Sequence, residues 1–128
     1  MMTELTINRK PIIMKIIIAD DEKMILVVLR RYLTRKGHET IEAASALQAI
    51  QAFDANPEVG LIITDLAMEA GESGLEVLRH ARNVSATVKL CLTSGSLTDE
   101  VARKANLLGA EVFSKPYDMN ELCSKLGI

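Results

Sequence analysis

Polar side chains of five residues come directly after short apolar runs, and their chemical types could together handle phosphate. They are Asp20 and Asp21 after KIIIA, Asp65 after LIIT, Thr93 after KLCL and Lys115 after AEVFS. Three carboxylates held together repel one another and raise each other's pKa values unless a cation lies among them. Mg²⁺ suits such a set, because it prefers a few carboxylate oxygens completed by water and phosphate oxygens.

Lys115 and Thr93 supply the groups that would contact a phosphoryl group. Lys115 offers a compact positive charge that can pair with Asp65 at rest and with a phosphoryl oxygen when one arrives. The hydroxyl of Thr93 can donate to another phosphoryl oxygen. An aspartate can itself accept the group, with catalysis coming from positioning and charge neutralisation. Asp65 is the predicted acceptor, because it stands alone at the end of the middle strand.

The elements that must position these side chains alternate between β-branched runs and segments of helical period. The predicted strands are Met14 to Ala19, Glu39 to Ala43, Val59 to Asp65, Thr87 to Thr93 and Ala110 to Lys115. The predicted helices are Met24 to Lys36, a helix capped by Ser45 and Gln48 and running through Phe53, Leu75 to Arg82, Thr98 to Leu108, and a short final helix capped by Asp118 and Glu121. Repeated strand–helix units of this kind favour a parallel sheet covered on both faces.

Five such units predict an α/β fold with a single doubly wound five-stranded parallel sheet of the flavodoxin-like kind. Ligands of these sheets bind beyond the carboxyl ends of the strands, at the point where the strand order reverses. The five polar residues should therefore converge on one rim of the sheet. Residues 1–13 precede this pattern and form an N-terminal extension of unknown role, so the predicted domain covers residues 14–128.

Composition favours one cytoplasmic domain that binds neither nucleic acid nor membrane. The 128 residues, 48% of them hydrophobic, are enough for one core and too few for two ordinary domains. A formal net charge of −2 creates no field that attracts nucleic acid or an anionic membrane. The apolar runs are far shorter than the roughly 20 residues of a membrane-spanning helix. Two cysteines and two histidines form no disulfide framework and no metal-ligand spacing.

Four short motifs at predicted strand ends resemble the receiver domains of two-component response regulators. They are ADDE at 19–22, ITDLAM at 63–68, LTSG at 92–95 and FSKPY at 113–117. The resemblance covers the chain from Met14 onward and implies the (βα)₅ receiver fold. It implies that Asp65 takes a phosphoryl group from a phosphohistidine on a sensor histidine kinase or phosphotransfer protein. A downstream protein target would then respond.

The resemblance also implies a role for each site residue. Asp20 and Asp21 would bind Mg²⁺ together with Asp65 and the backbone carbonyl of Ala67. Thr93 and Lys115 would contact the phosphoryl group, with a cis peptide bond between Lys115 and Pro116.

Three departures from the family pattern concern the surroundings of the site. Met68-Glu69 stands where the family usually has Met-Pro, and Gly74 falls one residue later than usual, which predicts a loop altered in shape and charge. Val112 stands three residues before the lysine, where receivers often place an aromatic residue, so that residue is absent or displaced to Phe113. The short final helix resembles single-domain regulators of the chemotaxis type or a receiver excised from a longer protein.

Two other classes of function compete with a phosphorylated receiver. Haloacid-dehalogenase-type phosphatases also use an Asp nucleophile at a strand end. Their motif is D-x-D, however, and Ala67 stands at its second acidic position here, so the general acid is missing. A pseudo-receiver would keep the fold as an interaction module without accepting phosphate, and it usually lacks the acceptor or the lysine. A P-loop nucleotide site is excluded because no G-x-x-x-x-G-K-[ST] sequence occurs.

Overall fold

The computed structural model describes residues 13–69, 71 and 73–128, so nearly all of the predicted N-terminal extension lies outside the described residues. Five parallel strands form one sheet in the order β2-β1-β3-β4-β5, as the doubly wound fold predicts. The strands are β1 Lys15–Ala19, β2 Glu39–Ala43, β3 Leu61–Asp65, β4 Lys89–Ser94 and β5 Ala110–Ser114. The helices are α2 Lys23–Arg35, α3 Ala46–Ala55, α4 Ser73–Val84, α5 Asp99–Leu107 and α6 Met119–Leu126.

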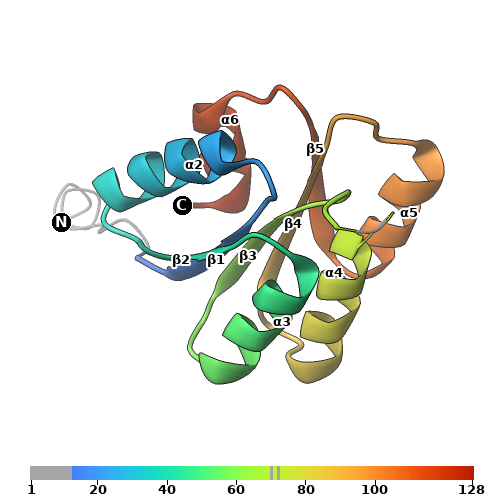
Figure 1. Ribbon diagram of the computed structural model, residues 1–128, viewed down its shortest axis with the longest axis horizontal. Coiled ribbons are helices and arrows are strands. Elements are labelled where there is room, and N and C mark those ends of the chain that lie inside the picture. The colour runs from blue at the N-terminus through green and yellow to red at the C-terminus, as the bar shows by residue number, and fades with distance from the viewer. Residues whose placement is uncertain (1–12, 70, 72) are drawn as a thin grey trace, which may run out of the picture.

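Helices cover both faces of the sheet, with α2 and α6 on one face and α3, α4 and α5 on the other (Figure 1). Successive strand side chains point to opposite faces, so each strand contributes to both cores. In β1, Ile17 packs toward α3, α4 and α5, whereas Ile16 and Ile18 pack toward α2 and α6. All five residues of β3 are buried, as expected for the central strand of a parallel sheet.

The strand register brings the ends of the central strands level with one another. Ala19 pairs with Thr64, and Asp65 pairs with Thr93. Phe113 is in turn the partner of Thr93 on β5. The residues that follow β1, β3 and β5 therefore emerge at one rim of the sheet.

Side-chain caps begin the helices that the sequence marked most clearly. Ser45 Oγ accepts from the backbone N–H of Gln48, and the Gln48 side chain accepts from the N–H of Ala44. Asp118 accepts from the N–H of Glu121 in the same way. These bonds satisfy amide groups that have no partner inside a helix, so both predicted caps are confirmed.

Helix and strand boundaries differ from the prediction by one or two residues. Strand β3 begins at Leu61 rather than Val59, and β4 begins at Lys89 rather than Thr87. Helix α4 begins at Ser73, two residues before the predicted Leu75, because its first turn packs directly on the end of β3. In the part of the chain that the structure describes, no helix is long and apolar enough to cross a bilayer.

Phe113 does not take the place of the aromatic residue that the family usually has at Val112. Phe113 packs in the cluster with α2 and α6, edge-on to Tyr117 at a centroid distance of 6.5 Å. Val112 packs against the opposite cluster. Neighbouring residues of a strand face opposite sides of the sheet, so Phe113 lies on the wrong face for that role.

Candidate functional site

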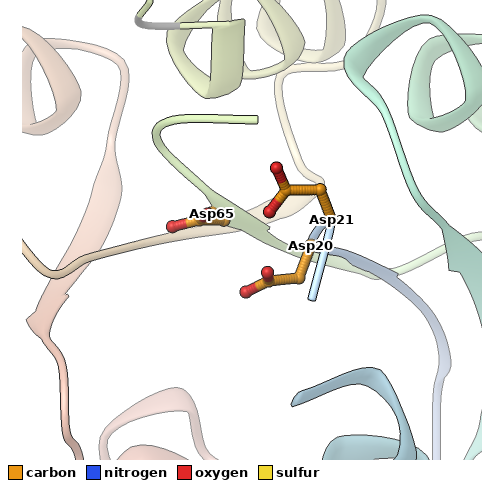
Figure 2. A group of neighbouring side chains, drawn as sticks. All are labelled: Asp20, Asp21 and Asp65. Atoms are coloured by element: carbon orange, nitrogen blue, oxygen red, sulfur yellow. The ribbon is translucent and has the colours of Figure 1, made fainter. Parts of the chain in front are cut away.

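The carboxylates of three aspartates meet at the rim where β1 and β3 end (Figure 2). One oxygen from each of Asp20, Asp21 and Asp65 can be chosen so that all three lie within 4.8 Å of one another. Asp20 is 1% exposed and Asp65 is 7% exposed, whereas Asp21 is open to solvent. An open position beside two buried carboxylates suits a hard divalent cation that keeps some of its water.

Lys115 forms an ion pair with each of the two buried carboxylates. Its Nζ lies 2.9 Å from Oδ2 of Asp20 and 3.2 Å from Oδ1 of Asp65. The sequence suggested Asp65 as the partner, and the structure adds Asp20 as the nearer one. A signal was available: Asp20 follows Ile18 by two residues and Lys115 follows Phe113 by two. Ile18 and Phe113 face the same side of the sheet.

The pKa values of Asp65 and Lys115 both lie above their ordinary positions. Burial raises the pKa of Asp65 most, the charge of Asp20 raises it further, and Lys115 offsets only part of this. Burial alone would lower the pKa of Lys115, but the hydrogen bond to Asp20 and the two carboxylate charges outweigh it. Both pKa values can be raised together because the lysine has two carboxylate partners, whereas the two carboxylates share one lysine. The rim therefore holds excess negative charge.

Thr93 is the partner of Asp65 in the register of β3 and β4, and Ala67 follows Asp65 by two residues. Thr93 is 2% exposed, and its hydroxyl donates to the carbonyl of Thr64 in a long hydrogen bond of 3.5 Å. So long a bond is weak and easily exchanged for a better acceptor. Ala67 is exposed in the segment that leaves β3, two residues after Asp65.

Residue Gly74 holds the start of α4 against the end of β3. Its N–H donates to the carbonyl of Leu66 over 2.8 Å. A Cβ at this position would lie 2.1 Å from the carbonyl oxygen of Asp65 and 2.8 Å from Cα of Leu66. The late glycine that the sequence showed as a departure therefore makes a close contact with the backbone of the predicted acceptor.

The carboxylate of Glu69 is a contact that the sequence did not predict. Its Oε1 and Oε2 lie 3.0 Å and 2.9 Å from the backbone nitrogen of Ala46 at the start of α3. That hydrogen bond is the main reason why the pKa of Glu69 lies below its ordinary value. The sequence showed only an acidic residue where the family usually has proline.

An open groove of about 460 Å³ adjoins the rim between α2 and the segment after β5. Lys115 and Tyr117 line it on one side, and Met24, Val28 and Leu29 of α2 line it on the other. Met24 is 70% exposed and Val28 is 51% exposed. Apolar side chains are therefore available to a partner directly beside the carboxylates.

The doubly wound sheet and its acidic rim define a flavodoxin-like domain with a site at the switch point. The family model of the response regulator receiver domain matches residues 16–127. The chain belongs to this family. Receiver domains of this kind are signalling modules of two-component systems, in which response regulators interact with histidine kinases and downstream effectors.

Relatives and solved structures agree with that assignment. The chain is 34% identical over 110 residues to the DNA-binding transcriptional regulator NtrC of Azospirillum brasilense, covering 85% of this chain and 22% of NtrC. It is 26% identical over 109 residues to sporulation initiation phosphotransferase F of Bacillus subtilis, covering 84% of this chain and 86% of the relative. It thus spans less than a quarter of NtrC and most of phosphotransferase F.

Two solved structures show the same fold. The response regulator receiver protein from Pseudomonas putida is 28% identical with a TM-score of 0.78, and the match covers 92% of this chain and 96% of that one. The complex of CheX and CheY with BeF₃ and magnesium from Borrelia burgdorferi contains a chain with a TM-score of 0.80. That chain is 17% identical, with 88% of this chain and 86% of that chain covered, so it supports the fold alone.

Proposed function

We propose that the chain accepts a phosphoryl group on Asp65 from the phosphohistidine of a sensor histidine kinase or phosphotransfer protein. The observation that carries this proposal is the placement of Lys115 Nζ between Asp20 and Asp65, within a cluster of three carboxylates. Phosphorylation would then change the binding of a downstream protein target. In this proposal the domain of residues 14–128 acts in the cytoplasm and catalyses only its own phosphorylation and dephosphorylation.

The carboxylate cluster fits Mg²⁺, because burial, and after it the charge of Asp20, raise the pKa of Asp65 even with Lys115 in place, and a cation would relieve both effects. Asp20, Asp21, Asp65 and the backbone carbonyl of Ala67 would hold the ion. When bound, Mg²⁺ supplies charge neutralisation for the phosphoryl oxygens and for the carboxylates.

The residues of the chain would carry the transfer itself. A carboxylate oxygen of Asp65 attacks phosphorus, the bond from phosphorus to the donor's imidazole nitrogen breaks, and its electron pair stays on that nitrogen. Lys115 exchanges a carboxylate partner for a phosphoryl oxygen, which keeps its charge paired throughout. The Thr93 hydroxyl exchanges its long bond to Thr64 for another phosphoryl oxygen.

Incubation with acetyl phosphate and Mg²⁺ tests the acceptor. Intact-mass spectrometry should show one added phosphoryl group on the parent chain and none on Asp65→Asn, because an amide is not a nucleophile for phosphorus. Asp54→Asn is the matched control, since Asp54 is an exposed aspartate in the last turn of α3 that pairs with His80 of α4. Equal labelling of Asp65→Asn and parent would place the acceptor elsewhere.

The same experiment separates the competing functions. A parent chain that hydrolyses a phosphomonoester with turnover would behave as a phosphatase. A parent chain that takes no phosphate from acetyl phosphate, and does not bind beryllofluoride, would be an interaction module with the receiver fold.

The groove beside Lys115 is suited to the phosphodonor protein. Any donor must bring its phosphohistidine to Asp65, and the exposed apolar side chains of Met24 and Val28 line the same groove as Lys115, which contacts Asp65. Farther along α2, Arg31 and Arg35 line a second, basic hollow. A donor with an apolar patch flanked by acidic residues would complement both parts.

Val28→Asp should slow phosphotransfer from a phosphorylated histidine kinase about tenfold or more, because a charge buried in an apolar contact removes more than 1 kcal/mol of binding. Labelling by acetyl phosphate should be unchanged. The control is Val84→Asp, since Val84 is 62% exposed at the end of α4, away from the groove. Equal kinase rates for the two variants would remove the groove from the donor surface.

A further inference from the structure

Three residues of segment 66–69, which follows β3, form hydrogen bonds with other parts of the chain. The N–H of Leu66 donates to the carbonyl of Thr93 over 2.8 Å. The N–H of Met68 donates to Oγ of Ser73 over 3.3 Å. The side chain of Glu69 accepts from the N–H of Ala46 on α3. Ala67 lies between these anchors.

The amide of Ala46, in the first turn of α3, is not used by the local caps of that helix. Ser45 Oγ is occupied by the N–H of Gln48, and the Gln48 side chain is occupied by the N–H of Ala44. The first amides of a helix lack partners inside the helix and carry partial positive charge. Both oxygens of Glu69 lie within hydrogen-bonding distance of Ala46, which makes a charge-assisted contact. This contact joins the segment after β3 to α3, the helix that follows β2.

Among the described residues, the bonds that would hold the segment without the Glu69 contact are those of Leu66 to Thr93 and Gly74, at its first residue, and the long bond from Met68 to Ser73. The family's usual proline restrains such a segment through its own ring, whereas this chain has one more residue before Gly74 and no proline there. The hydrogen bond between the Glu69 side chain and α3 restrains the segment in place of the proline ring.

We propose that Glu69 is a positioning residue for the divalent-cation site. Its carboxylate holds segment 66–69 against α3, so that the carbonyl of Ala67 stays where it can complete the ligand set of Asp20, Asp21 and Asp65. This inference rests on the proposed function. In this proposal Glu69 acts through the backbone and not as a ligand, since both of its oxygens lie within hydrogen-bonding distance of the Ala46 amide on α3.

Calorimetric titration with MgCl₂ tests the proposal on the full chain. Glu69→Ala should bind Mg²⁺ about tenfold more weakly than the parent, the usual effect of removing a group that orients a ligand. Glu69→Gln should recover most of that loss, because its amide oxygen still accepts from Ala46. Glu76→Ala is the matched control for charge, since Glu76 is an exposed acidic residue of α4, and it should bind like the parent.

Amide hydrogen exchange without metal gives a second reading. Ala46 should exchange faster in Glu69→Ala than in the parent and in Glu69→Gln, because only the alanine variant lacks an acceptor. Unchanged exchange at Ala46 in Glu69→Ala would overturn the proposal.

The titration separates failure of this inference from failure of the proposed function. If the parent binds Mg²⁺ and Glu69→Ala binds it equally well, Glu69 does not position the site. If Glu69→Gln binds Mg²⁺ as weakly as Glu69→Ala does, the negative charge of Glu69 acts on the ion at a distance, and the positioning role is refuted. A parent chain that binds no Mg²⁺ would overturn the proposed metal site and this inference together.

Discussion

Replacing Lys115 with methionine should lower the free energy of unfolding of the metal-free protein by about 3 kcal/mol at pH 7. Methionine keeps the length and packing of the stem and removes the charge. The side chains of Asp20 and Asp65 are 2% and 9% exposed, and Lys115 is the cation that contacts both. Removing one member of a buried ion pair leaves an uncompensated charge, which is more destabilising than never having buried the pair.

The loss should depend on pH in a defined direction. The pKa of Asp65 is raised in the folded parent, so the folded state binds a proton more readily than the unfolded state, and its carboxylate is destabilising above the ordinary Asp pKa. Without Lys115 that pKa rises further. The loss of unfolding free energy in Lys115→Met, relative to the parent, should therefore be largest near neutral pH. It should shrink as the pH falls through the raised pKa of Asp65.

Urea unfolding with and without MgCl₂ measures the effect. Mg²⁺ should restore a larger share of stability to Lys115→Met than to the parent, because it neutralises the same carboxylates. The double variant Asp20→Asn, Lys115→Met is the control for lost packing and should be more stable than the single variant. If the double variant is as unstable as Lys115→Met, the lost stability comes from the stem and not from unpaired charge.

Gly74→Ala should destabilise the protein by about 3 kcal/mol, the upper end of what overpacking usually costs. The added Cβ would lie 2.1 Å from the carbonyl oxygen of Asp65, and both partners are backbone, so no side-chain rotation can relieve the contact. Alanine is otherwise favoured over glycine in a helix by about 1 kcal/mol. A stabilised variant would therefore show that α4 does not approach β3 this closely.

The same variant should also weaken the site, because α4 or the end of β3 must move to admit the methyl group. We expect lower Mg²⁺ affinity and slower labelling by acetyl phosphate in Gly74→Ala, measured beside urea unfolding. Gly60→Ala is the matched control: its Cβ would lie 3.7 Å from the Met14 side chain, an ordinary contact. Equal labelling rates for the two variants would show that the contact with Asp65 does not position the acceptor.

The sequence by itself determined the order and type of the elements and which residues reach the rim. Five apolar runs of β-branched character, separated by helical periods, allow few arrangements other than a doubly wound parallel sheet. Polar residues at the strand ends must then share one edge, whatever the details of packing. The caps at Ser45 and Asp118 could likewise be predicted, because each depends on residues three apart.

The pairing of Lys115 with Asp65 could be predicted from the sequence, whereas only the tertiary structure showed that Asp20 is the nearer partner. The bond from Lys115 to Asp20 joins residues 95 positions apart, and it depends on the register of β1, β3, β4 and β5. The hydrogen bond from the Ala46 N–H to the Glu69 carboxylate depends on how closely α3 approaches the end of β3. Residue patterns carry the period of a strand or helix, but contacts between elements depend on distances that arise only when both faces of the sheet are packed.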